Sequence, residues 1–231
     1  MTSDALQRRA FLGSACGSLG ILALAGDLGV AAETESARKL KTGPTAELKA
    51  AREKLMAELE ANRGIGVPRE DGQFLHLMTL ATNAQKVLEI GTYRGYSGIC
   101  FGTALEQTGG KLVTIDIDSE RVKESRANFT KAGLADRITN LEGDGHKLAK
   151  TVEGPFDLVF LDAEKGGEID YFNTVFPKLR PGGVILVHNA IMSKRSMQPY
   201  FDMMSKHPEI VHVILSLTMK DGFSVSLRKR G

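Results

Sequence analysis

The sequence lacks the features that tie a protein to a membrane, to nucleic acid or to a disulfide framework. It has no tryptophan and only two cysteines among 231 residues, too few for a fold held by disulfides. Its 30 basic and 28 acidic residues leave a formal net charge of +2, which predicts no nucleic-acid partner. No apolar run reaches the roughly 20 residues of a membrane-spanning helix. We therefore expect one globular domain whose partner is a small molecule.

The first 32 residues differ in composition from the rest. Arg8 and Arg9 precede an uncharged stretch over 10–26 that is rich in alanine, glycine and leucine, and Ala31 and Ala32 follow it. A basic start, a short apolar middle and a small-residue exit are typical of a secretory signal. The paired arginines resemble a twin-arginine export signal. The alternatives are a membrane-spanning helix, which the short length disfavours, and an ordinary N-terminal helix.

This composition predicts three parts of the chain: an export signal peptide over 1–32, a flexible lead-in over 33–43 and a folded domain over 44–231. Cleavage after Ala32 removes Cys16 and leaves Cys100 as the single thiol, so we expect no intrachain disulfide and no stable membrane anchor. The mature protein is then exported to the periplasm; if the signal is not used, it stays in the cytoplasm.

Short apolar runs alternate with helical periods along the rest of the chain. The spacing predicts helices over 44–62, 68–84, 96–107, 119–131, 169–179 and 197–207. Apolar runs predict strands over 87–90, 112–115, 138–141, 156–161, 184–187, 211–215 and 223–227. This alternation favours an α/β fold with a mostly parallel, doubly wound sheet, whose last two strands pair antiparallel. Its ligand is expected at the carboxyl ends of the strands, near the point where the strand order reverses.

The stretch over 87–97, Val-Leu-Glu-Ile-Gly-Thr-Tyr-Arg-Gly-Tyr-Ser, combines a strand, a glycine turn and a helix start. Backbone approaches a nucleotide-like ligand closely in such a turn. Tyr93 replaces the middle glycine of a dinucleotide fingerprint, which disfavours a pyrophosphate ligand and a nicotinamide dehydrogenase. A sulfonium nucleoside with an amino-acid tail fits, because Glu89 can approach its ammonium group while Ser97 and the helix amides hold its carboxylate. The alternative is a crowded loop without a ligand.

Acidic residues also stand at the ends of the next two strands. Asp116 follows Gly91 by 25 residues, and Asp144 follows the strand over 138–141. A carboxylate at the first position accepts both ribose hydroxyls, and one at the second accepts from an adenine amino group. Each acid alone is more often a solvated surface side chain. Together with Glu89, the two predict one nucleoside site.

Two later segments carry a resemblance to a known family: Phe-Asp-Leu-Val-Phe-Leu-Asp-Ala-Glu-Lys over 156–165, and Leu-Arg-Pro-Gly-Gly-Val-Ile-Leu-Val-His-Asn over 179–189. With most of the chain between Val67 and Phe223, they resemble the cation-dependent O-methyltransferases of the catechol and caffeoyl-CoA type. The resemblance implies a Rossmann-like class I methyltransferase fold, with a seven-stranded, mostly parallel sheet and an antiparallel last strand. It also implies a homodimer.

The resemblance further implies the residues of the site. Asp162, His188 and Asn189 would bind a divalent cation that holds two adjacent substrate oxygens, and Lys165, beside Asp162, would be the general base. A metal lowers the pKa of a phenol and orients its oxygen for attack on the methyl group. The residues expected to line the S-adenosylmethionine site are Val67, Glu89, Gly91, Tyr93, Ser97, Asp116, Ile117, Asp144 and Asp162.

Three positions depart from the family pattern. His188 replaces an aspartate among the metal ligands, Glu168 a tyrosine of the plant enzymes, and Leu215 a substrate-binding glutamate of the animal catechol enzymes. Imidazole suits Zn²⁺ or Mn²⁺ better than Mg²⁺. Two alternatives stay open for His188: a nitrogen ligand of such a cation, or a strand-end histidine bonded to a neighbour without a metal. The remaining histidines are expected to lie without partners: His76, His146, His207 and His212.

We expect an S-adenosylmethionine-dependent O-methyltransferase that acts on a small phenolic or catechol-like acceptor, with or without a metal. The alternative is an exported, non-catalytic protein that binds S-adenosylmethionine or another nucleoside. Export favours this alternative, because the methyl donor is made in the cytoplasm.

Overall fold

The computed structural model describes residues 43–216 and 220–231. The predicted signal peptide, 1–32, and all but the last residue of the predicted lead-in, 33–43, lie outside the described residues. Within the described part, no helix is both long and apolar enough to cross a membrane.

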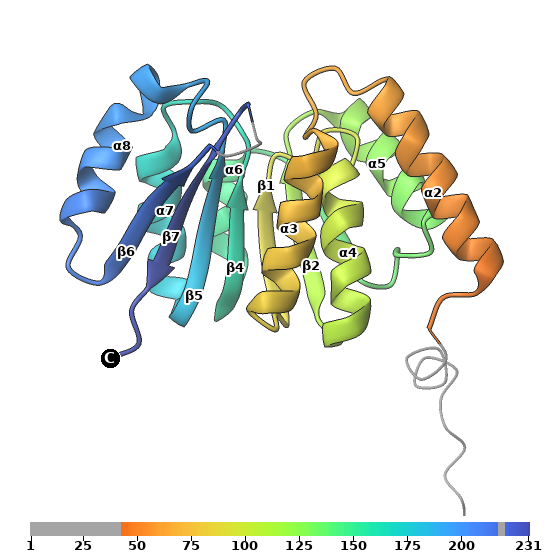
Figure 1. The fold of residues 1–231 in the computed structure, drawn as a ribbon, viewed down its shortest axis with the longest axis horizontal. Coiled ribbons are helices and arrows are strands. Elements are labelled where there is room, and N and C mark those ends of the chain that lie inside the picture. The colour runs from red at the N-terminus through yellow and green to blue at the C-terminus, as the bar shows by residue number, and fades with distance from the viewer. Residues whose placement is uncertain (1–42, 217–219) are drawn as a thin grey trace, which may run out of the picture.

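Helices and strands alternate along the described chain, as the sequence predicts (Figure 1). The helices are α2 (Ala46–Ala61), α3 (Arg69–Ala81), α4 (Tyr96–Thr108), α5 (Ser119–Lys131), α6 (Gly145–Thr151), α7 (Glu168–Val175) and α8 (Lys194–Lys206). The strands are β1 (Lys86–Ile90), β2 (Lys111–Asp116), β3 (Ile138–Glu142), β4 (Phe156–Leu161), β5 (Leu179–His188), β6 (Ile210–Leu215) and β7 (Phe223–Arg228).

The seven strands form one sheet in the order β3-β2-β1-β4-β5-β7-β6. Strands β1 to β5 pair in parallel, and β7 lies antiparallel between β5 and β6. The chain builds outward from β1 to β3 on one side and from β4 on the other, so the strand order reverses between β1 and β4. The predicted doubly wound, mostly parallel sheet with an antiparallel last strand is confirmed.

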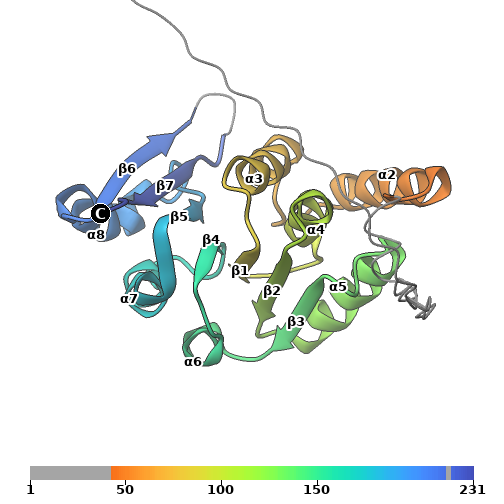
Figure 2. The same cartoon turned by 90° about the horizontal axis from the view of Figure 1, so that it is seen from below.

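Helices cover both faces of this sheet (Figure 2). Successive strand residues point to opposite faces, so Val87 packs in the core beneath α2 to α5, while Leu88 packs in the core beneath α6 to α8. Phe101 and Phe129 fill the first core, and Phe172 fills the second. Burying these apolar side chains is the main term that stabilises the fold.

Several elements differ from the prediction: α3 ends at Ala81 and not at 84, and α8 begins at Lys194 and not at 197. Strand β5 begins at Leu179 and not at 184, because its irregular start, where the register against β4 shifts, still pairs with Phe156. The predicted helix over 169–179 ends at Val175, where a 3₁₀ turn (Phe176–Lys178) with a proline follows. Helix α6 was not predicted, since seven residues are too few to reveal a helical period.

The ends of β1 and β4 meet at Gly91. The Asp162 backbone N–H donates to the Ile90 carbonyl at 2.8 Å, and a Cβ atom on Gly91 would lie 2.3 Å from the Asp162 carbonyl oxygen. The φ of Gly91 is 101°, in the region that favours glycine. Glycine therefore lets the chain leave β1 directly beside the end of β4.

Gly91→Ala should destabilise the fold more than Gly166→Ala. The two glycines have similar φ angles, 101° and 108°, but a Cβ on Gly166 meets nothing within 4 Å among the described residues. The unfavourable φ costs both variants about 1 kcal/mol, while the contact with Asp162 costs Gly91→Ala a further ~1–3 kcal/mol. Urea unfolding of both variants measures the difference. Equal losses of stability would show that the β1–β4 contact has room for a side chain.

Candidate functional site

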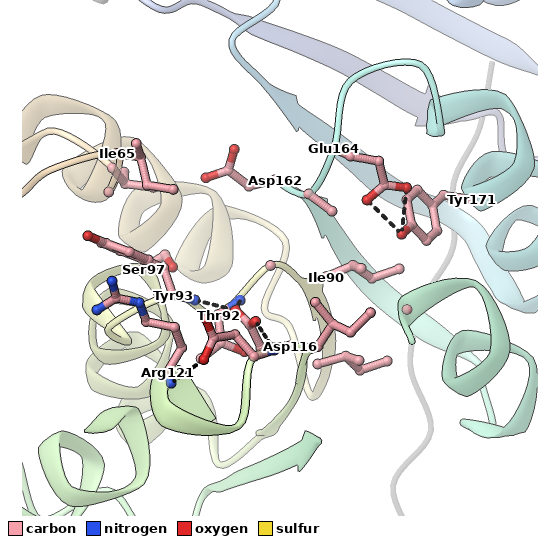
Figure 3. A pocket seen from close by; sticks show the side chains of 18 of the residues that line it. Ile65, Ile90, Thr92, Tyr93, Ser97, Asp116, Arg121, Asp162, Glu164 and Tyr171 are labelled. Carbon is pink, nitrogen blue, oxygen red and sulfur yellow. Dashed lines mark hydrogen bonds between the residues drawn. The ribbon is translucent and has the colours of Figure 1, made fainter. Parts of the chain in front are cut away.

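A cavity of about 840 Å³ opens where the strand order reverses, at the carboxyl ends of β1 to β4 (Figure 3). This is the place expected for a ligand of a doubly wound sheet. Figure 3 shows Asp162 between the side chains that follow β1 and β2 and a separate pair, Glu164 and Tyr171. Eight of the nine residues predicted for the donor site line the cavity: Val67, Gly91, Tyr93, Ser97, Asp116, Ile117, Asp144 and Asp162.

The Asp116 carboxylate is fixed by backbone amides at the cavity wall. Its Oδ2 accepts from the N–H groups of Thr92 at 3.0 Å and Tyr93 at 2.7 Å, and its Oδ1 accepts from Asp118 N–H at 3.0 Å. Oδ2 already accepts two hydrogen bonds, whereas Oδ1 can accept a further one. Asp116 therefore presents a pre-oriented, negatively charged acceptor to the cavity.

Glu89, the ninth residue, does not line the cavity but lies buried behind the glycine turn. Its Oε2 accepts from the Thr114 hydroxyl at 2.6 Å, and its Oε1 has no hydrogen-bond partner among the described residues. Burial raises the pKa of Glu89 to about 8, against the opposing effect of the Ser97 and Thr114 hydroxyls. Directly behind the cavity, the chain therefore has a buried carboxyl oxygen that can still accept a hydrogen bond.

Tyr93 shapes the wall opposite Asp162. Its φ of 48° is in the left-handed region, which is uncommon for a side chain of this size. The Arg121 guanidinium lies over its ring, 4.6 Å from the centroid, a cation–π contact that holds the ring in place. The sequence interpretation missed Arg121, because a charged residue on a helix gives no signal of such a partner.

The acceptor end predicted from the sequence gathers at Asp162. Lys165 Nζ lies 3.3 Å from Asp162 Oδ1, and both residues line the cavity together with Asn189. The φ of Asn189, 59°, is in the left-handed region that asparagine tolerates better than most residues. An ammonium group and a carboxylate thus lie together at the carboxyl end of β4.

His188 does not join this wall. It is only 1 % exposed, and its ring contacts carboxylates on both sides. Nδ1 lies 3.2 Å from Asp162 Oδ1, Nε2 lies 2.7 Å from Asp71 Oδ2, and Asp221 Oδ2 is 3.8 Å from Nε2. Burial lowers the pKa of His188, but the hydrogen bonds to Asp162 and Asp71 and the charges of these carboxylates raise it to about 9.

The donor set does not fit the divalent cation that the family resemblance implies. Both ring nitrogens of His188 face carboxylate oxygens, so neither offers a lone pair to the cavity. Asp162 and Asn189 are the two predicted ligands that remain at the wall, and the Lys165 ammonium already lies against Asp162. One carboxylate and one amide beside a lysine form a poor site for a hard cation, which prefers several oxygen ligands.

A second group of side chains at the cavity was also missed. His146 lies between Asp170 and Glu164, with Nδ1 to Asp170 Oδ2 at 2.5 Å and Nε2 to Glu164 Oε1 at 2.6 Å, and it stacks on the Tyr171 ring. The Tyr171 hydroxyl donates to Glu164 at 3.1 Å. The prediction that the remaining histidines lie without partners is wrong, since these contacts join segments 18 and 24 residues apart, which no local spacing reveals.

The other three histidines have partners as well. His76 Nδ1 contacts the Cys100 carbonyl at 3.2 Å, His207 Nδ1 accepts from the Glu209 N–H at 3.2 Å, and His212 Nε2 contacts the Ser224 hydroxyl at 3.0 Å. None of the three lines the cavity. These three histidines therefore make hydrogen bonds within the fold and away from the cavity.

Comparison with curated proteins finds O-methyltransferases among the relatives of this chain. A catechol O-methyltransferase of Mycobacterium tuberculosis is 31 % identical over 197 residues, which cover 75 % of this chain and 87 % of the relative. A caffeoyl-CoA O-methyltransferase of Zinnia elegans is 32 % identical over 136 residues, which cover 56 % of this chain and 55 % of the relative. A catechol O-methyltransferase of Niastella koreensis is 33 % identical over 131 residues, and the match spans 59 % of its length.

Solved structures and a family model agree with these relatives. A cofactor-bound protein from MTB, Rv0187, superposes with a TM-score of 0.70 at 28 % identity, covering 85 % of this chain and 96 % of that one. An O-methyltransferase from Bacillus cereus in complex with SAH has a TM-score of 0.70 at 24 % identity, over 84 % and 96 % of the chains, and supports the fold. The O-methyltransferase family model matches residues 44–227. The predicted methyltransferase class is confirmed at this level: the chain belongs to the O-methyltransferase family.

Proposed function

We propose that this protein transfers the methyl group of S-adenosylmethionine to a hydroxyl oxygen of a small phenolic or catechol-like acceptor. The observation that carries the proposal is the Asp116 carboxylate, held by three backbone amides at the wall of the cavity. The family's O-methyltransferases and the SAH named in one structural relative support the donor. The named catechol and caffeoyl-CoA relatives support the acceptor class.

The charge of the cavity suits a cationic donor. Its lining has two basic side chains, Arg121 and Lys165, against five acidic ones: Asp116, Asp118, Asp144, Asp162 and Glu164. S-adenosylmethionine carries a sulfonium and an ammonium group. Such complementarity favours binding of the charged donor over a neutral nucleoside.

Each part of the donor has a candidate partner in the chain. Asp116 would accept from the ribose hydroxyls and Asp144 from the adenine amino group, while Ser97, at the start of α4, would hold the carboxylate tail. Glu89, whose Oε1 is unpartnered among the described residues, would face the ammonium group through the turn. A cation there would favour the ionised form of this carboxyl.

Proton removal falls to Lys165. In its free-amine form, Nζ takes the proton of the acceptor hydroxyl, and the Asp162 carboxylate 3.3 Å away stabilises the resulting ammonium. The donor supplies the methyl group: the acceptor oxygen bonds to its carbon while the carbon–sulfur bond breaks and leaves its electron pair on sulfur. Binding of the acceptor with its oxygen in line with the methyl group would reduce the entropic part of the barrier.

Asp116→Asn should weaken the binding of both S-adenosylmethionine and S-adenosylhomocysteine by about 10- to 100-fold, because hydrogen bonds to a charged group contribute about 1.5–3 kcal/mol. The amide keeps the shape, and its oxygen can still accept from the Thr92 and Tyr93 N–H groups, while the bond from the Asp118 N–H is lost. Isothermal titration calorimetry of the full chain measures the change, with Asp136→Asn, an exposed loop aspartate, as the matched control. Unchanged affinity in Asp116→Asn, or no binding by the wild type, would refute the donor site.

Lys165→Met should lower kcat for methylation of a catechol by about 10²- to 10⁴-fold, the usual range for loss of a general base. Donor affinity should stay the same, because Lys165 is assigned to the acceptor and not to the nucleoside. Transfer of a labelled methyl group provides the assay. The control is Lys54→Met, which removes an exposed lysine of α2 that does not line the cavity. A variant with wild-type kcat would exclude Lys165 as the base.

A further inference from the structure

Three carboxylates, of which Asp162 lines the cavity and the other two lie behind it, surround the imidazole ring of His188. Asp71 comes from α3, Asp162 from the end of β4 and Asp221 from the turn before β7, while His188 ends β5. Asp71 is fully buried and His188 almost so, whereas the Asp221 side chain keeps 17 % of its exposure. The cluster therefore has little water with which to balance its negative charge.

Hydrogen-bond chemistry determines what His188 does in this cluster. Its two contacts, 3.2 Å to Asp162 and 2.7 Å to Asp71, both end on carboxylate oxygens, which accept and do not donate when ionised. With both carboxylates ionised, each ring nitrogen donates a proton to one of them, and the ring is an imidazolium. The 2.7 Å contact is also shorter than the separation of two ligands around a metal, which bond lengths of about 2.0–2.2 Å would open to roughly 3 Å.

Packing keeps the ring in this arrangement. The rings of Phe160 and Phe223 lie against it, with centroids 6.2 and 5.2 Å away. The Ala190 N–H donates to the Gly222 carbonyl at 3.0 Å, which ties the chain after His188 to the turn that carries Asp221. Turning His188 towards the cavity would leave the Asp71 carboxylate buried without a partner, a costly state.

We propose that this chain, as the methyltransferase proposed above, works without a divalent cation at its acceptor end, because His188 takes the cation's place among the carboxylates. His188 is then a positioning residue: it holds the Asp162 carboxylate from behind while Lys165 meets the same carboxylate from the cavity. His188 occupies the position at which the cation-dependent pattern has a metal-binding aspartate. Its ring supplies a positive charge at this position in place of the metal.

The test is Mn²⁺ binding, followed by the loss of the free-ion electron paramagnetic resonance signal as protein is added. The wild type is expected to bind no Mn²⁺ at concentrations up to about 1 mM, and its affinity for S-adenosylhomocysteine should be the same with EDTA as with Mn²⁺. His188→Asp removes the internal cation and adds an oxygen ligand next to Asn189. This variant should gain one Mn²⁺ site, at least about tenfold tighter than any binding by the wild type.

Two controls make the gain specific. The double variant His188→Asp with Asp162→Asn should lose the gained site, and His207→Asp, the same change far from the cavity at the end of α8, should gain none. Where His188→Asp is unstable because four carboxylates crowd together, Mn²⁺ should raise its melting temperature and leave that of the wild type unchanged.

Binding of one Mn²⁺ by the wild type would overturn the proposal. If Asp162→Asn abolished this binding, the metal would lie at the family's cation site. If both Asp71→Asn and Asp221→Asn abolished it, the metal would lie among Asp71, His188 and Asp221, whose ligand atoms are within 4.8 Å of one another. Failure of His188→Asp to gain Mn²⁺, by signal loss or by thermal stabilisation, would also overturn it. Because the readout is metal binding, these outcomes are independent of whether the catechol assay succeeds.

Discussion

The close approach of β1 to β4 at Gly91 determines where this protein can bind a ligand. With no side chain on Gly91, the backbone lies against the Asp162 carbonyl, and the chain turns at once into the loop whose amides hold Asp116. The same contact places Asp116, proposed to bind the methyl donor, and Asp162 with Lys165, proposed to meet the acceptor, at one cavity. Methyl transfer requires both reactants within bonding reach, so the geometry of this single glycine underlies the chemistry.

Acidic side chains lie both at the cavity wall and in the buried layer behind it. The wall, which is predominantly acidic, suits a cationic donor. The carboxyl groups of the buried layer depend on neighbouring protein groups, because water does not reach them. Glu89 lies in that layer with a raised pKa and a free oxygen, and His188 lies there between two carboxylates. Buried charge persists only where it is paired, and His188 provides that pairing on the acceptor side.

Much of the fold and of the cavity could be predicted from the sequence, because both depend on local patterns. Apolar runs that alternate with helical periods gave the sheet and its antiparallel last strand, and glycine and acidic residues at strand ends marked the wall. What could not be predicted depends on contacts between distant segments. Asp71 lies 117 residues from His188, and their pairing turns a candidate metal ligand away from the cavity. His146 finds Glu164 and Asp170 in the same way. Export and homodimer formation stay predictions.

We propose that the cavity at the carboxyl ends of β1 and β4 binds the methyl donor through Asp116. The decisive measurement is a crystal structure of the protein with S-adenosylhomocysteine. We expect the ribose hydroxyls on the Asp116 carboxylate, with the sulfur directed towards Lys165. A nucleoside bound elsewhere, or bound in this cavity with its ribose away from Asp116, would contradict it.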